Sequence, residues 1–528
     1  MQMEEKCLHI VPEPVEVRRM GDKTFRLWRG AVVGYSDRSV RFEAAYLADY
    51  ALRYLGLPLS VKKLVTDDVA TNVCAVRLVN AKNRRQSGGY RLTVDASGVV
   101  VQGNDAAGLF YGVQTLIQLL PTRAGIVPQL PMVEVTDYPR FAYRGMHLDV
   151  VRHYFPVAYI KQYIDRMALH KLNFFHWHLT DDQGWRLDLK CYPQLTQAGS
   201  MRAGEIEGVY PGVYQEQPYG GYYTAEDVAE VVRYAQERHI TVIPEVDIPG
   251  HCMAVLQAFP HFGTEPETVK ECAKTWHVFE KQNNVLAPTE EVFRFLTDVF
   301  NEVCDLFPGP YIHVGGDECA KCWWRQSPQA QHFMQTQGLK DEDALQSYFI
   351  HHVKAVLDQR GKTLVGWDEI LDGGLSKDCI VMNWRRSSVG KRSAKAGYRT
   401  ISTSIYRMYF NLKESASQRE VGPDAIAIPV ERVYEYAIVP EGLSEQEAEN
   451  IIGVQGCLWT EYTRSPWKVE FSAFPRMAAL SENGWSLPER KGWSHFSDKL
   501  VTQLERYELW GIRYSPFFPR KKKVAWKR

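Results

Sequence analysis

The stretch Y-I-H-V-G-G-D-E at residues 311–318 organises the rest of the chain. It begins as a short apolar strand, loses its side chains at Gly315-Gly316, and ends in the adjacent carboxylates of Asp317 and Glu318. Two glycines let the backbone turn sharply and let a ligand approach it closely. Two neighbouring acids allow one carboxyl to be protonated while the other is charged. The simpler interpretation is a strand followed by an acidic helix N-terminus, so the surrounding sequence has to decide.

An apolar strand followed by a helical segment recurs throughout the chain after residue 140. One such helix is marked by Thr224 and Asp227, which have the spacing of a capping box, and by apolar residues at helical spacing behind them. This cyclic alternation predicts a (β/α)8 TIM barrel with long loops, in which functional side chains lie at the C-terminal ends of the strands. The eight expected strands are Gly145–Asp149, Asn173–Leu179, Ile240–Asp247, Tyr311–Asp317, Thr363–Asp368, Cys379–Trp384, Tyr398–Ser404 and Ile452–Thr460.

Residues 1–138 have a different pattern, in which short strands are mixed with two helices. The second helix starts after Gly103-Asn104 and ends before Pro121, which are ordinary boundary signals. We therefore predict a small α+β domain at 1–138, followed by the barrel domain at 139–528 with a C-terminal helix and a basic tail at 520–523. The strands expected in the first domain are Val76–Asn80, Tyr90–Val94 and Gly98–Gln102, and the helices are Phe42–Leu55 and Asp105–Leu120.

The chain has 528 residues, with 63 basic and 63 acidic side chains, so its formal net charge is zero. This balance gives no reason to expect nucleic acid as a partner, and no apolar run is long enough to span a membrane. Residues 1–6 do not have the pattern of a signal peptide. The compartment stays open: periplasmic or extracellular if a leader has been removed, and cytoplasmic otherwise. The oligomeric state also stays open, and a homodimer is one of the options.

The ten cysteines are spread along the chain. Only Cys319 and Cys322 have a CxxC spacing, and no second pair completes a zinc site. We expect these two thiols to be free, with a local disulfide as the alternative.

The ends of the expected barrel strands carry many acids, histidines and tryptophans. A barrel that served packing alone would not need such side chains at nearly every strand end. Together they predict a polar pocket with aromatic walls, which suits a saccharide. These residues are Asp149, His176, His178, Asp181, Asp182, Glu245, Asp247, His251, Asp317, Glu318, Trp367, Asp368, Glu369, Trp384, Trp459 and Glu461.

His176 and His178, on the second expected strand, allow a rival interpretation. A His-x-His pair places both imidazoles on one face of a strand, and metal-dependent hydrolases built on barrels use such pairs. A metal site of that kind also needs ligands from later strands, whereas strands five, six and eight offer tryptophans. We therefore expect no metal and no cofactor, and we interpret both histidines as satisfied by neighbours inside the barrel.

The acidic pair also constrains the reaction. A retaining glycosidase normally needs two carboxyl groups about 5–5.5 Å apart that flank the anomeric carbon, and sequence neighbours at one strand end are poorly placed for that. Either a second acid, such as Glu369 or Glu461, comes from another strand, or a 2-acetamido group of the substrate attacks C1 itself. A different barrel hydrolase and a catalytically inactive sugar-binding protein stay as alternatives, although the intact Asp317-Glu318 pair argues against the second.

Seven segments have the order and content of motifs of one known family. They are Arg144-Gly145 with Asp149 and Arg152-His153, residues 176–186 (HWHLTDDQGWR), 244–251 (PEVDIPGH), 313–318 (HVGGDE), 366–369 (GWDE), 459–461 (WTE) and 108–112 (GLFYG). With these motifs the sequence resembles the glycoside hydrolase family 20 β-N-acetylhexosaminidases over nearly the whole chain. Its N-terminal unit resembles the non-catalytic α+β domain of that family.

The resemblance implies exo-acting, retaining hydrolysis of terminal β-linked GlcNAc or GalNAc through an oxazolinium intermediate, with a glycan as the partner and no cofactor. It implies that Glu318 is the acid/base and that Asp317 polarises the acetamido group. It further implies a relay that supports the acid/base, residues that bind the sugar hydroxyls, and an acetamido pocket. The relay residues are Asp181 and His251, the hydroxyl-binding residues are Arg144 and Glu461, and the pocket residues are Trp367, Trp384, Trp459 and Tyr409.

One position departs from the family pattern. Members often carry Asp two residues after the pocket tyrosine, near O6 of the sugar, whereas this chain has Tyr409-Phe410-Asn411. The resemblance then implies that the O6 corner has lost a negative charge, and we expect Asn411 to allow a 6-O-sulfated GlcNAc to bind.

Overall fold

The computed structural model describes residues 8–64, 74–81, 86–208, 212–265, 267–268, 270–275, 283–417, 420, 422–423 and 426–517. The basic tail expected at 520–523 lies outside these residues, and so do residues 1–6, which were considered as a signal peptide.

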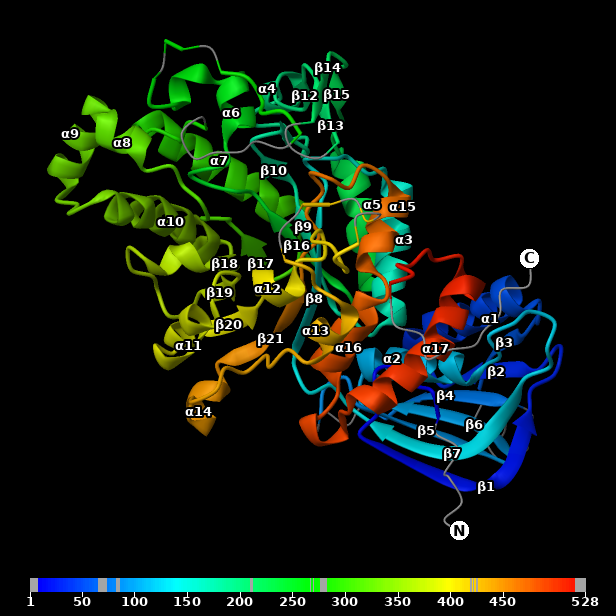
Figure 1. The fold of residues 1–528 in the computed structure, drawn as a ribbon. Coiled ribbons are helices and arrows are strands. Elements are labelled where there is room, and N and C mark those ends of the chain that lie inside the picture. The colour runs from blue at the N-terminus through cyan, green and yellow to red at the C-terminus, as the bar shows by residue number, and fades with distance from the viewer. Residues whose placement is uncertain are drawn as a thin grey trace.

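Eight parallel strands close into a barrel in the order β16-β17-β18-β19-β20-β21-β8-β9 (Figure 1). Each of them overlaps one of the strands that the sequence predicts, so the predicted fold class is confirmed. Strand β8 is buried along its whole length, as expected for a parallel strand that is covered on both faces. The strands are β8 (Tyr143–Asp149), β9 (Phe174–His178), β16 (Thr241–Glu245), β17 (Tyr311–His313), β18 (Thr363–Trp367), β19 (Ile380–Asn383), β20 (Arg399–Ser402) and β21 (Ile451–Gly456).

Helices cover the outside of the barrel. At the start of α5, the Thr224 hydroxyl accepts a hydrogen bond from the Asp227 N–H, and the Asp227 carboxylate accepts one from the Thr224 N–H, so the predicted capping box is present. The connection after β18 is an exception, because it contains only the 3₁₀ helix η4 (Asp368–Leu371). The main covering helices are α3 (Val157–Leu169), α5 (Ala225–Gln236), α7 (Glu290–Leu306), α10 (Glu342–Gln359), α11 (Ser387–Lys395) and α16 (Arg476–Trp485).

Short elements fill the loops between the main strands and helices. Two small hairpin-like sheets pair β12 with β15 and β13 with β14. The short strands are β10 (Thr180–Asp181), β11 (Gly184–Trp185), β12 (Met201–Arg202), β13 (Glu205–Glu207), β14 (Val213–Gln215) and β15 (Tyr219–Gly220). The short helices are α4 (Gln194–Gln197), α6 (Met253–Ala258), η3 (Pro260–Phe262), α8 (Cys322–Gln326), α9 (Pro328–Gln337), α12 (Ile405–Met408), α13 (Val430–Tyr434), α14 (Glu445–Ala448), α15 (Pro466–Ala473) and η5 (Pro488–Arg490).

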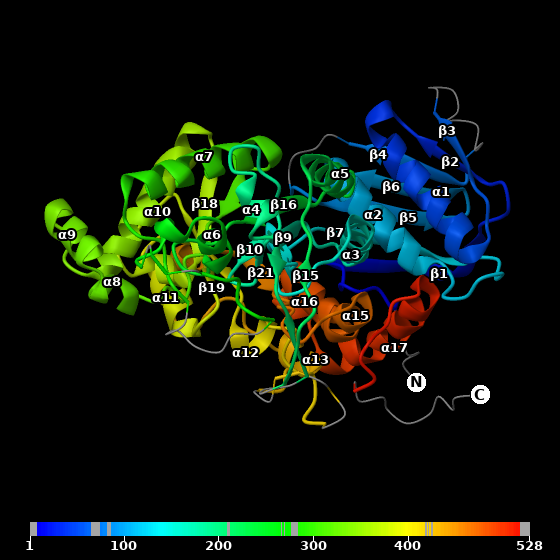
Figure 2. The same ribbon diagram turned by 90° about the horizontal axis from the view of Figure 1, so that it is seen from above.

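The N-terminal part forms a mixed seven-stranded sheet in the order β1-β7-β5-β6-β4-β2-β3. Its helices α1 and α2 lie on the face that is turned toward the barrel (Figures 1 and 2), where Phe110 of α2 packs against His239 of the barrel domain. The elements are β1 (Glu16–Arg26), β2 (Val32–Tyr35), η1 (Arg38–Val40), α1 (Arg41–Leu55), β3 (Ser60–Lys63), β4 (Val76–Asn80), β5 (Tyr90–Asp95), β6 (Gly98–Gly103), α2 (Ala106–Leu119) and β7 (Gln129–Asp137).

The C-terminal helix α17 (Trp493–Trp510) joins the two parts. Its Arg506 guanidinium donates a hydrogen bond to the backbone oxygen of Gln118 in α2, and its Trp510 indole donates one to the Tyr50 hydroxyl in α1. Figure 2 shows α17 beside the sheet, in red. The expected C-terminal helix is therefore present, and it packs on the N-terminal domain.

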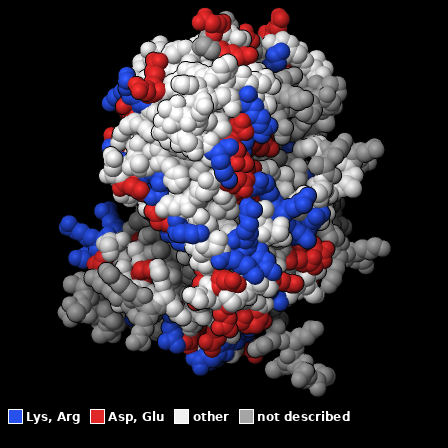
Figure 3. All heavy atoms as spheres, turned by 90° about the vertical axis from the view of Figure 1, so that its left-hand side faces the viewer, with Lys and Arg blue, Asp and Glu red and all other residues white. Residues whose placement is uncertain are grey.

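The surface that carries α8 to α11 has basic side chains near its middle with acidic ones beside them (Figure 3), in keeping with the zero net charge of the sequence. In the described part of the chain, every helix is too short or too polar to cross a membrane. Cys319 and Cys322 are free thiols, as expected.

Candidate active site

The acidic pair follows β17 on a tight turn. Gly315 and Gly316 have φ of 64° and 93°, and a Cβ atom on Gly315 would lie 1.7 Å from Oδ1 of Asp247, so only glycine fits there. Glu318 itself has φ of 46°, a conformation that costs a non-glycine residue free energy. The turn therefore holds Asp317 and Glu318 in a strained arrangement beyond the C-terminal end of a barrel strand.

A line of hydrogen bonds leads from the barrel interior to His251, which lies beside this pair. Nδ1 of His178 lies 2.5 Å from Oε2 of Glu245, and its Nε2 lies 2.9 Å from Oδ2 of Asp181. Burial lowers the pKa of His178, but these two carboxylates outweigh it and raise the pKa to about 10. Oδ1 of Asp181 then accepts a hydrogen bond from Nδ1 of His251 at 3.0 Å. The structure thus brings Asp181 and His251 together, and it connects them to Glu245 inside the barrel.

Among the described residues, four carboxylates have an oxygen within 4 Å of an imidazole nitrogen of His251. Its Nδ1 is also 3.1 Å from Oδ2 of Asp182, and its Nε2 is 3.8 Å from Oδ2 of Asp317 and 3.7 Å from Oε2 of Glu318. Burial lowers the pKa of His251, but the acids around it, Asp181 first, raise it well above the ordinary value. A cationic imidazole is therefore placed beside both members of the acidic pair.

The two acids have different surroundings. Asp317 is 9% exposed, and burial raises its pKa to about 6, with His251 opposing this shift and Glu318 adding to it. The Glu318 side chain is 58% exposed, and the neighbouring His251 lowers its pKa. Asp247 is buried beside Asp317, and burial together with that neighbour raises its pKa well above the ordinary value. These environments shift the pKa values of Asp317 and Glu318 in opposite directions, as two different roles for the two carboxyls require.

Four aromatic rings form a wall next to the acids. Trp384 stacks on Tyr409 with ring centroids 6.3 Å apart, Tyr409 lies 6.2 Å from Trp459, and Trp459 lies 5.9 Å from Trp367. The charges of Asp317 and Glu318 both act on the Tyr409 hydroxyl, whose pKa is raised chiefly by burial. The structure therefore brings the predicted acetamido-pocket residues together beside the acidic pair. The wall is apolar enough to hold a methyl group.

Glu369 and Glu461 are the candidates for a second acid. Glu369 accepts a hydrogen bond from Nε1 of Trp384 at 2.9 Å, and burial, followed by the charges of Asp317 and Asp368, raises its pKa to about 9. A carboxyl that is neutral near pH 7 is a poor nucleophile. Burial also raises the pKa of Glu461. Its Oε2 atom is buried without a hydrogen-bond partner among the described residues, as expected for an atom that receives a ligand.

Arg152 is the arginine that the structure places at this site. Its guanidinium lies 2.8 Å from Oδ2 of Asp181 and 3.4 Å from Oδ2 of Asp149, and its Nε donates to Oε1 of Gln183 at 2.8 Å. The Trp459 ring lies 5.1 Å away. The charge of Arg152 acts on Glu461, so these two residues share one end of the site.

The expectation for Arg144 is corrected by its position near the N-terminal end of β8. Its Nε and Nη1 donate to the backbone oxygens of Lys171 and Phe141 at 2.9 and 2.7 Å, and Nη2 donates to the Tyr111 hydroxyl at 3.1 Å. The guanidinium packs on the Trp485 ring at 4.9 Å, and the residue is 2% exposed. Arg144 therefore joins the barrel to the N-terminal domain and lies away from the acidic pair. The same motif contains the arginine that does lie at the site, since Arg152 follows Asp149, the last residue of β8.

The histidines proposed for a metal site are engaged within the barrel. His178 donates from both nitrogens to carboxylates, and an imidazolium has no lone pair for a metal. Nδ1 of His176 accepts a hydrogen bond from Gln455 at 3.0 Å, and its Nε2 lies 3.0 Å from Oε2 of Glu245. Among the residues that the structure describes, three groups of donor atoms near the site are close enough to share an ion: His147-His176-Glu245, Asp181-Asp182-His251 and Asp247-His251-Asp317. The contacts of His176 and His178 favour the interpretation that these two histidines are engaged by neighbours, whereas Nε2 of His147 and of His251 has no hydrogen-bond partner among the described residues.

Asn411 follows Tyr409 by two residues and is partly buried, with an Oδ1 atom that is buried and has no hydrogen-bond partner among the described residues. The backbone of Tyr409 is fixed by a parallel bridge to Cys457 next to β21. The sequence interpretation assigned no specific catalytic or sugar-binding role to Arg152, His178, Glu245 or Asp247, although all of them occur in the quoted motifs or at strand ends.

Two protein-family models match the chain in succession. The model described as "Glycosyl hydrolase family 20, domain 2" matches residues 8–138, and the one described as "Glycosyl hydrolase family 20, catalytic domain" matches residues 141–488. A curated relative, the β-hexosaminidase of Porphyromonas gingivalis, is 37% identical over 520 residues, which are 97% of this chain and 64% of the relative. The chain thus spans less than two thirds of that protein.

Solved structures agree with these matches. The exo-β-N-acetylglucosaminidase of Vibrio harveyi in complex with N-acetylglucosamine superimposes with a TM-score of 0.85 at 29% identity, covering 96% of this chain and 78% of that one. A mutant β-hexosaminidase of Streptomyces plicatus in complex with the product GlcNAc gives a TM-score of 0.82 at 30% identity, covering 96% of both chains. The fold, the arrangement of the site and these matches agree, and the chain belongs to glycosyl hydrolase family 20.

Proposed function

We propose that this chain is an exo-acting, retaining β-N-acetylhexosaminidase, which removes terminal β-linked N-acetylglucosamine or N-acetylgalactosamine from glycans. Family membership supports the proposal, and so do the names of the relatives from Porphyromonas gingivalis and Vibrio harveyi. The observation that carries it is the placement of Asp317 and Glu318 at one strand end, where both act on Tyr409 of the aromatic wall.

The reaction proceeds with the substrate's own acetamido group as the nucleophile. Its carbonyl oxygen forms a bond to C1 while the bond from C1 to the leaving oxygen breaks, and Glu318 gives its proton to that oxygen. The ionised Asp317 accepts a hydrogen bond from the acetamido N–H and stabilises the positive charge of the oxazolinium ion. Water then attacks C1 and loses a proton to Glu318 while the bond between C1 and the acetamido oxygen breaks, which restores both the acetamido group and the original anomeric configuration.

The relay explains how Glu318 changes its charge during this cycle. Glu318 has to be protonated at the start, whereas His251 lowers its pKa in the unliganded protein. A bound leaving group covers the exposed carboxyl and removes water from it, which raises the pKa of an acid. After proton donation, the cationic His251 stabilises the carboxylate, and Asp181 fixes the orientation of the imidazole through a 3.0 Å hydrogen bond.

The remaining residues bind the sugar. Trp367, Trp384 and Trp459 enclose the acetamido methyl, and Tyr409 donates a hydrogen bond to the acetamido oxygen. Arg152 and Glu461 bind the hydroxyl groups at the other end of the ring, with the unpartnered Oε2 of Glu461 as an acceptor. Because Arg152 and Glu461 bind the hydroxyl groups at that end of the ring, the site accepts only a terminal sugar, which accounts for exo action.

A two-carboxylate mechanism has less support, because the pKa of Glu369 is raised to about 9 by burial. The decisive experiment measures cleavage of aryl N-acetylglucosaminide and N-acetylgalactosaminide with and without EDTA, and follows the anomeric configuration of the product by NMR. The proposal requires cleavage that is unaffected by EDTA and a β-configured first product. Loss of activity with EDTA would favour a metal-dependent hydrolase, and an absence of cleavage would favour a sugar-binding protein.

A finer part of the proposal concerns O6 of the sugar. We infer that Asn411 lies near O6 and allows a terminal 6-O-sulfated GlcNAc to bind. The partly buried amide has an unpartnered Oδ1, and it carries no negative charge that would repel a sulfate. The amide N–H also offers a donor to a sulfate oxygen.

A further inference from the structure

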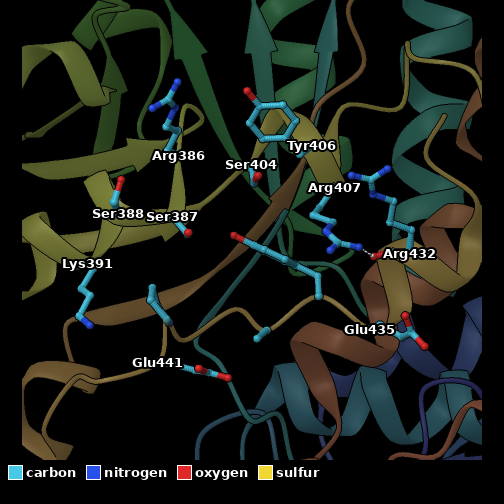
Figure 4. Close-up of a pocket in the computed structure, with 13 residues that line it drawn as sticks. Arg386, Ser387, Ser388, Lys391, Ser404, Tyr406, Arg407, Arg432, Glu435 and Glu441 are labelled. Carbon is cyan, nitrogen blue, oxygen red and sulfur yellow. Dashed lines mark hydrogen bonds between the residues drawn. The ribbon is translucent and has the colours of Figure 1, made fainter. Parts of the chain in front are cut away.

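A second pocket opens between α11, α12 and α13, with a volume of about 900 Å³ (Figure 4). None of the residues placed in the candidate active site lines it. Its walls carry four basic and two acidic side chains: Arg386, Lys391, Arg407, Arg432, Glu435 and Glu441. A concave site with this charge selects ligands by their negative charge.

Arg407 and Arg432 lie next to each other although both are cationic. Nη1 of Arg407 donates a hydrogen bond to the backbone oxygen of Arg432 at 3.3 Å, drawn as a dashed line in Figure 4. Burial, followed by the charge of Arg407, lowers the pKa of Arg432. In the described part of the chain, neither guanidinium has a carboxylate within ion-pair distance. Two neighbouring cations without a counter-ion repel each other, and an anion between them removes this cost.

The Arg432 side chain also has hydrogen-bonding capacity to spare. Its Nη1 donates to the backbone oxygen of Ala427 at 3.2 Å. Its Nε is buried and has no hydrogen-bond partner among the described residues. A buried donor of this kind costs free energy until a ligand accepts its hydrogen bond.

The opposite wall of the pocket in Figure 4 is the start of α11, with Arg386, Ser387 and Ser388. The side chain of the N-cap residue Arg386 makes no capping hydrogen bond, so it accepts none from the first N–H groups of the helix. These groups carry a partial positive charge and favour an anion, and the two serine hydroxyls add further donors. The N-terminal end of α11 therefore lies across the pocket from the Arg407–Arg432 pair.

The two acids restrict what fits. Glu435 and Glu441 lie at the lower edge of the pocket in Figure 4, below the arginines. They disfavour a long polyanion that would run past them, whereas a single anionic group above them meets the basic side chains of the pocket. Guanidinium groups bind the oxygens of a tetrahedral oxyanion through paired hydrogen bonds, for which arginine is better suited than lysine.

We propose that this pocket binds a tetrahedral oxyanion, a sulfate or phosphate group, between the Arg407–Arg432 pair and the N-terminus of α11. The group is either a free ion or an ester on a glycan. This pocket shares no lining residue with the candidate active site, so the binding proposal can be tested independently of the proposed hydrolysis.

Isothermal titration calorimetry of the whole chain with sodium sulfate, galactose 6-sulfate and galactose tests the proposal, at an ionic strength held constant with sodium chloride. Galactose 6-sulfate lacks an acetamido group, so the aromatic wall of the active site gives it no anchor. We expect saturable binding of both anions at millimolar concentrations and none of galactose. Tighter binding of galactose 6-sulfate than of sulfate would identify a glycan ester as the ligand, and equal binding would identify the free ion. Failure of both anions to saturate overturns the proposal.

Variants locate the binding. Arg407→Gln and the exposed Arg386→Gln should each weaken sulfate binding about tenfold, because each removes a charged donor. Arg392→Gln is the matched control: it lies on the same helix and removes the same charge, but its guanidinium pairs with Asp372 and its side chain is 61% exposed. Equal weakening in the control, or none in either pocket variant with an unchanged melting curve, contradicts the assignment. Arg386→Gln keeps the test valid if Arg407→Gln fails to fold.

Discussion

Nε2 of His251 lies 3.7 Å from Oε2 of Glu318, so the acid expected to donate the proton sits beside a cationic imidazole. The imidazole is itself held by Asp181, which bonds to His178 and through it to Glu245 at the barrel centre. The charge state of an exposed acid therefore depends on His251, whose side chain is 13% exposed, and through His251 on the buried groups behind it. This arrangement makes the pH dependence of the reaction the most direct test of the relay.

His251→Gln should move the pH profile of kcat/KM to higher pH. Removing the imidazolium raises the pKa of both Glu318 and Asp317, because His251 lowers each of them. The profile reports the acidic pair as a unit, so both of its limbs should shift in the same direction. The exposed His261→Gln, outside the site, is the control. A profile that falls in height without moving would show that His251 has a structural role only.

The same substitution has a defined effect on stability. The pKa of His251 is raised above its unfolded value, so the stabilisation from its charge is fully present below about pH 6.5 and is lost as pH rises through the folded pKa. Thermal unfolding of His251→Gln should therefore differ most from the native protein at low pH, and the difference should shrink in alkaline buffer.

Glu318→Gln should remove proton donation while sugar binding stays largely intact. General acid–base residues contribute about 10²–10⁴-fold in rate. The loss should be small for aryl glycosides with good leaving groups, which need little protonation, and large for poor ones. Rates measured across a series of aryl N-acetylglucosaminides decide this, and an equal loss for all leaving groups would contradict the assignment.

Asp317→Asn should weaken binding of a thiazoline mimic of the cyclised sugar, because a neutral amide stabilises the positive charge poorly. For the native protein, this mimic should bind much more tightly than N-acetylglucosamine, since it resembles the intermediate. Competition kinetics give both inhibition constants. Trapping a covalent sugar ester on Glu369 or Glu461 would replace this mechanism with a two-carboxylate one.

Asp317→Asn should also stabilise the fold near neutral pH. The pKa of Asp317 is about 6 in the folded protein, above its unfolded value, so stability is lost as pH rises between about 4 and 6. The amide avoids this cost, which is of the order of 1–3 kcal/mol for a shift of this size. Melting curves of the variant and the native protein should therefore diverge above pH 6 and converge below pH 4. A variant that melts lower at every pH would show that the amide loses contacts which outweigh the charge.

Arg152→Lys and Arg144→Lys form a matched pair that tests whether Arg152, and not Arg144, binds the sugar. Arg152→Lys should raise KM for aryl N-acetylglucosaminide, because a lysine cannot keep the contacts with Asp149, Asp181 and Gln183 together. Arg144→Lys should leave KM unchanged and lower the melting temperature, because it breaks hydrogen bonds at the domain junction. An increase in KM for Arg144→Lys alone would restore the first interpretation.

The barrel could be predicted from sequence because its strands are buried on both faces, which makes them continuous apolar runs between turn signals. Strands β1 and β3 of the N-terminal sheet could not, since their side chains are mostly exposed and charged, as at the edges of many sheets. Strand β7 contains Pro131, which argues against a strand when only the sequence is considered.

The site shows the same division. Acids, histidines and tryptophans at strand ends identify the rim, because all strand ends of a parallel barrel point the same way. Arg144 was wrongly assigned to the sugar site, because a motif gives the order of its residues but does not show at which end of a strand each residue lies. Arg144 is the second residue of β8, whereas Arg152 follows its last residue, Asp149. The pKa of Glu369 could not be predicted either, because it depends on burial and on Asp317 and Asp368 as neighbours in space.

Asn411→Asp should reduce the ability of the protein to accept a terminal 6-O-sulfated GlcNAc. A carboxylate a few ångströms from the sulfate repels it, and at a low effective dielectric this repulsion is worth several kcal/mol. The unsulfated sugar carries no charge at O6, so its kcat/KM should change little or improve through a new hydrogen bond from the O6 hydroxyl. The measurement is the ratio of kcat/KM for the sulfated and unsulfated aryl glycosides, in the native protein and in Asn411→Asp. Arg386→Gln is the control, because it changes the charge of the second pocket and not of the O6 corner. If Asn411→Asp leaves the ratio unchanged, Asn411 does not face O6, and the unpartnered Oδ1 of this residue serves another part of the site.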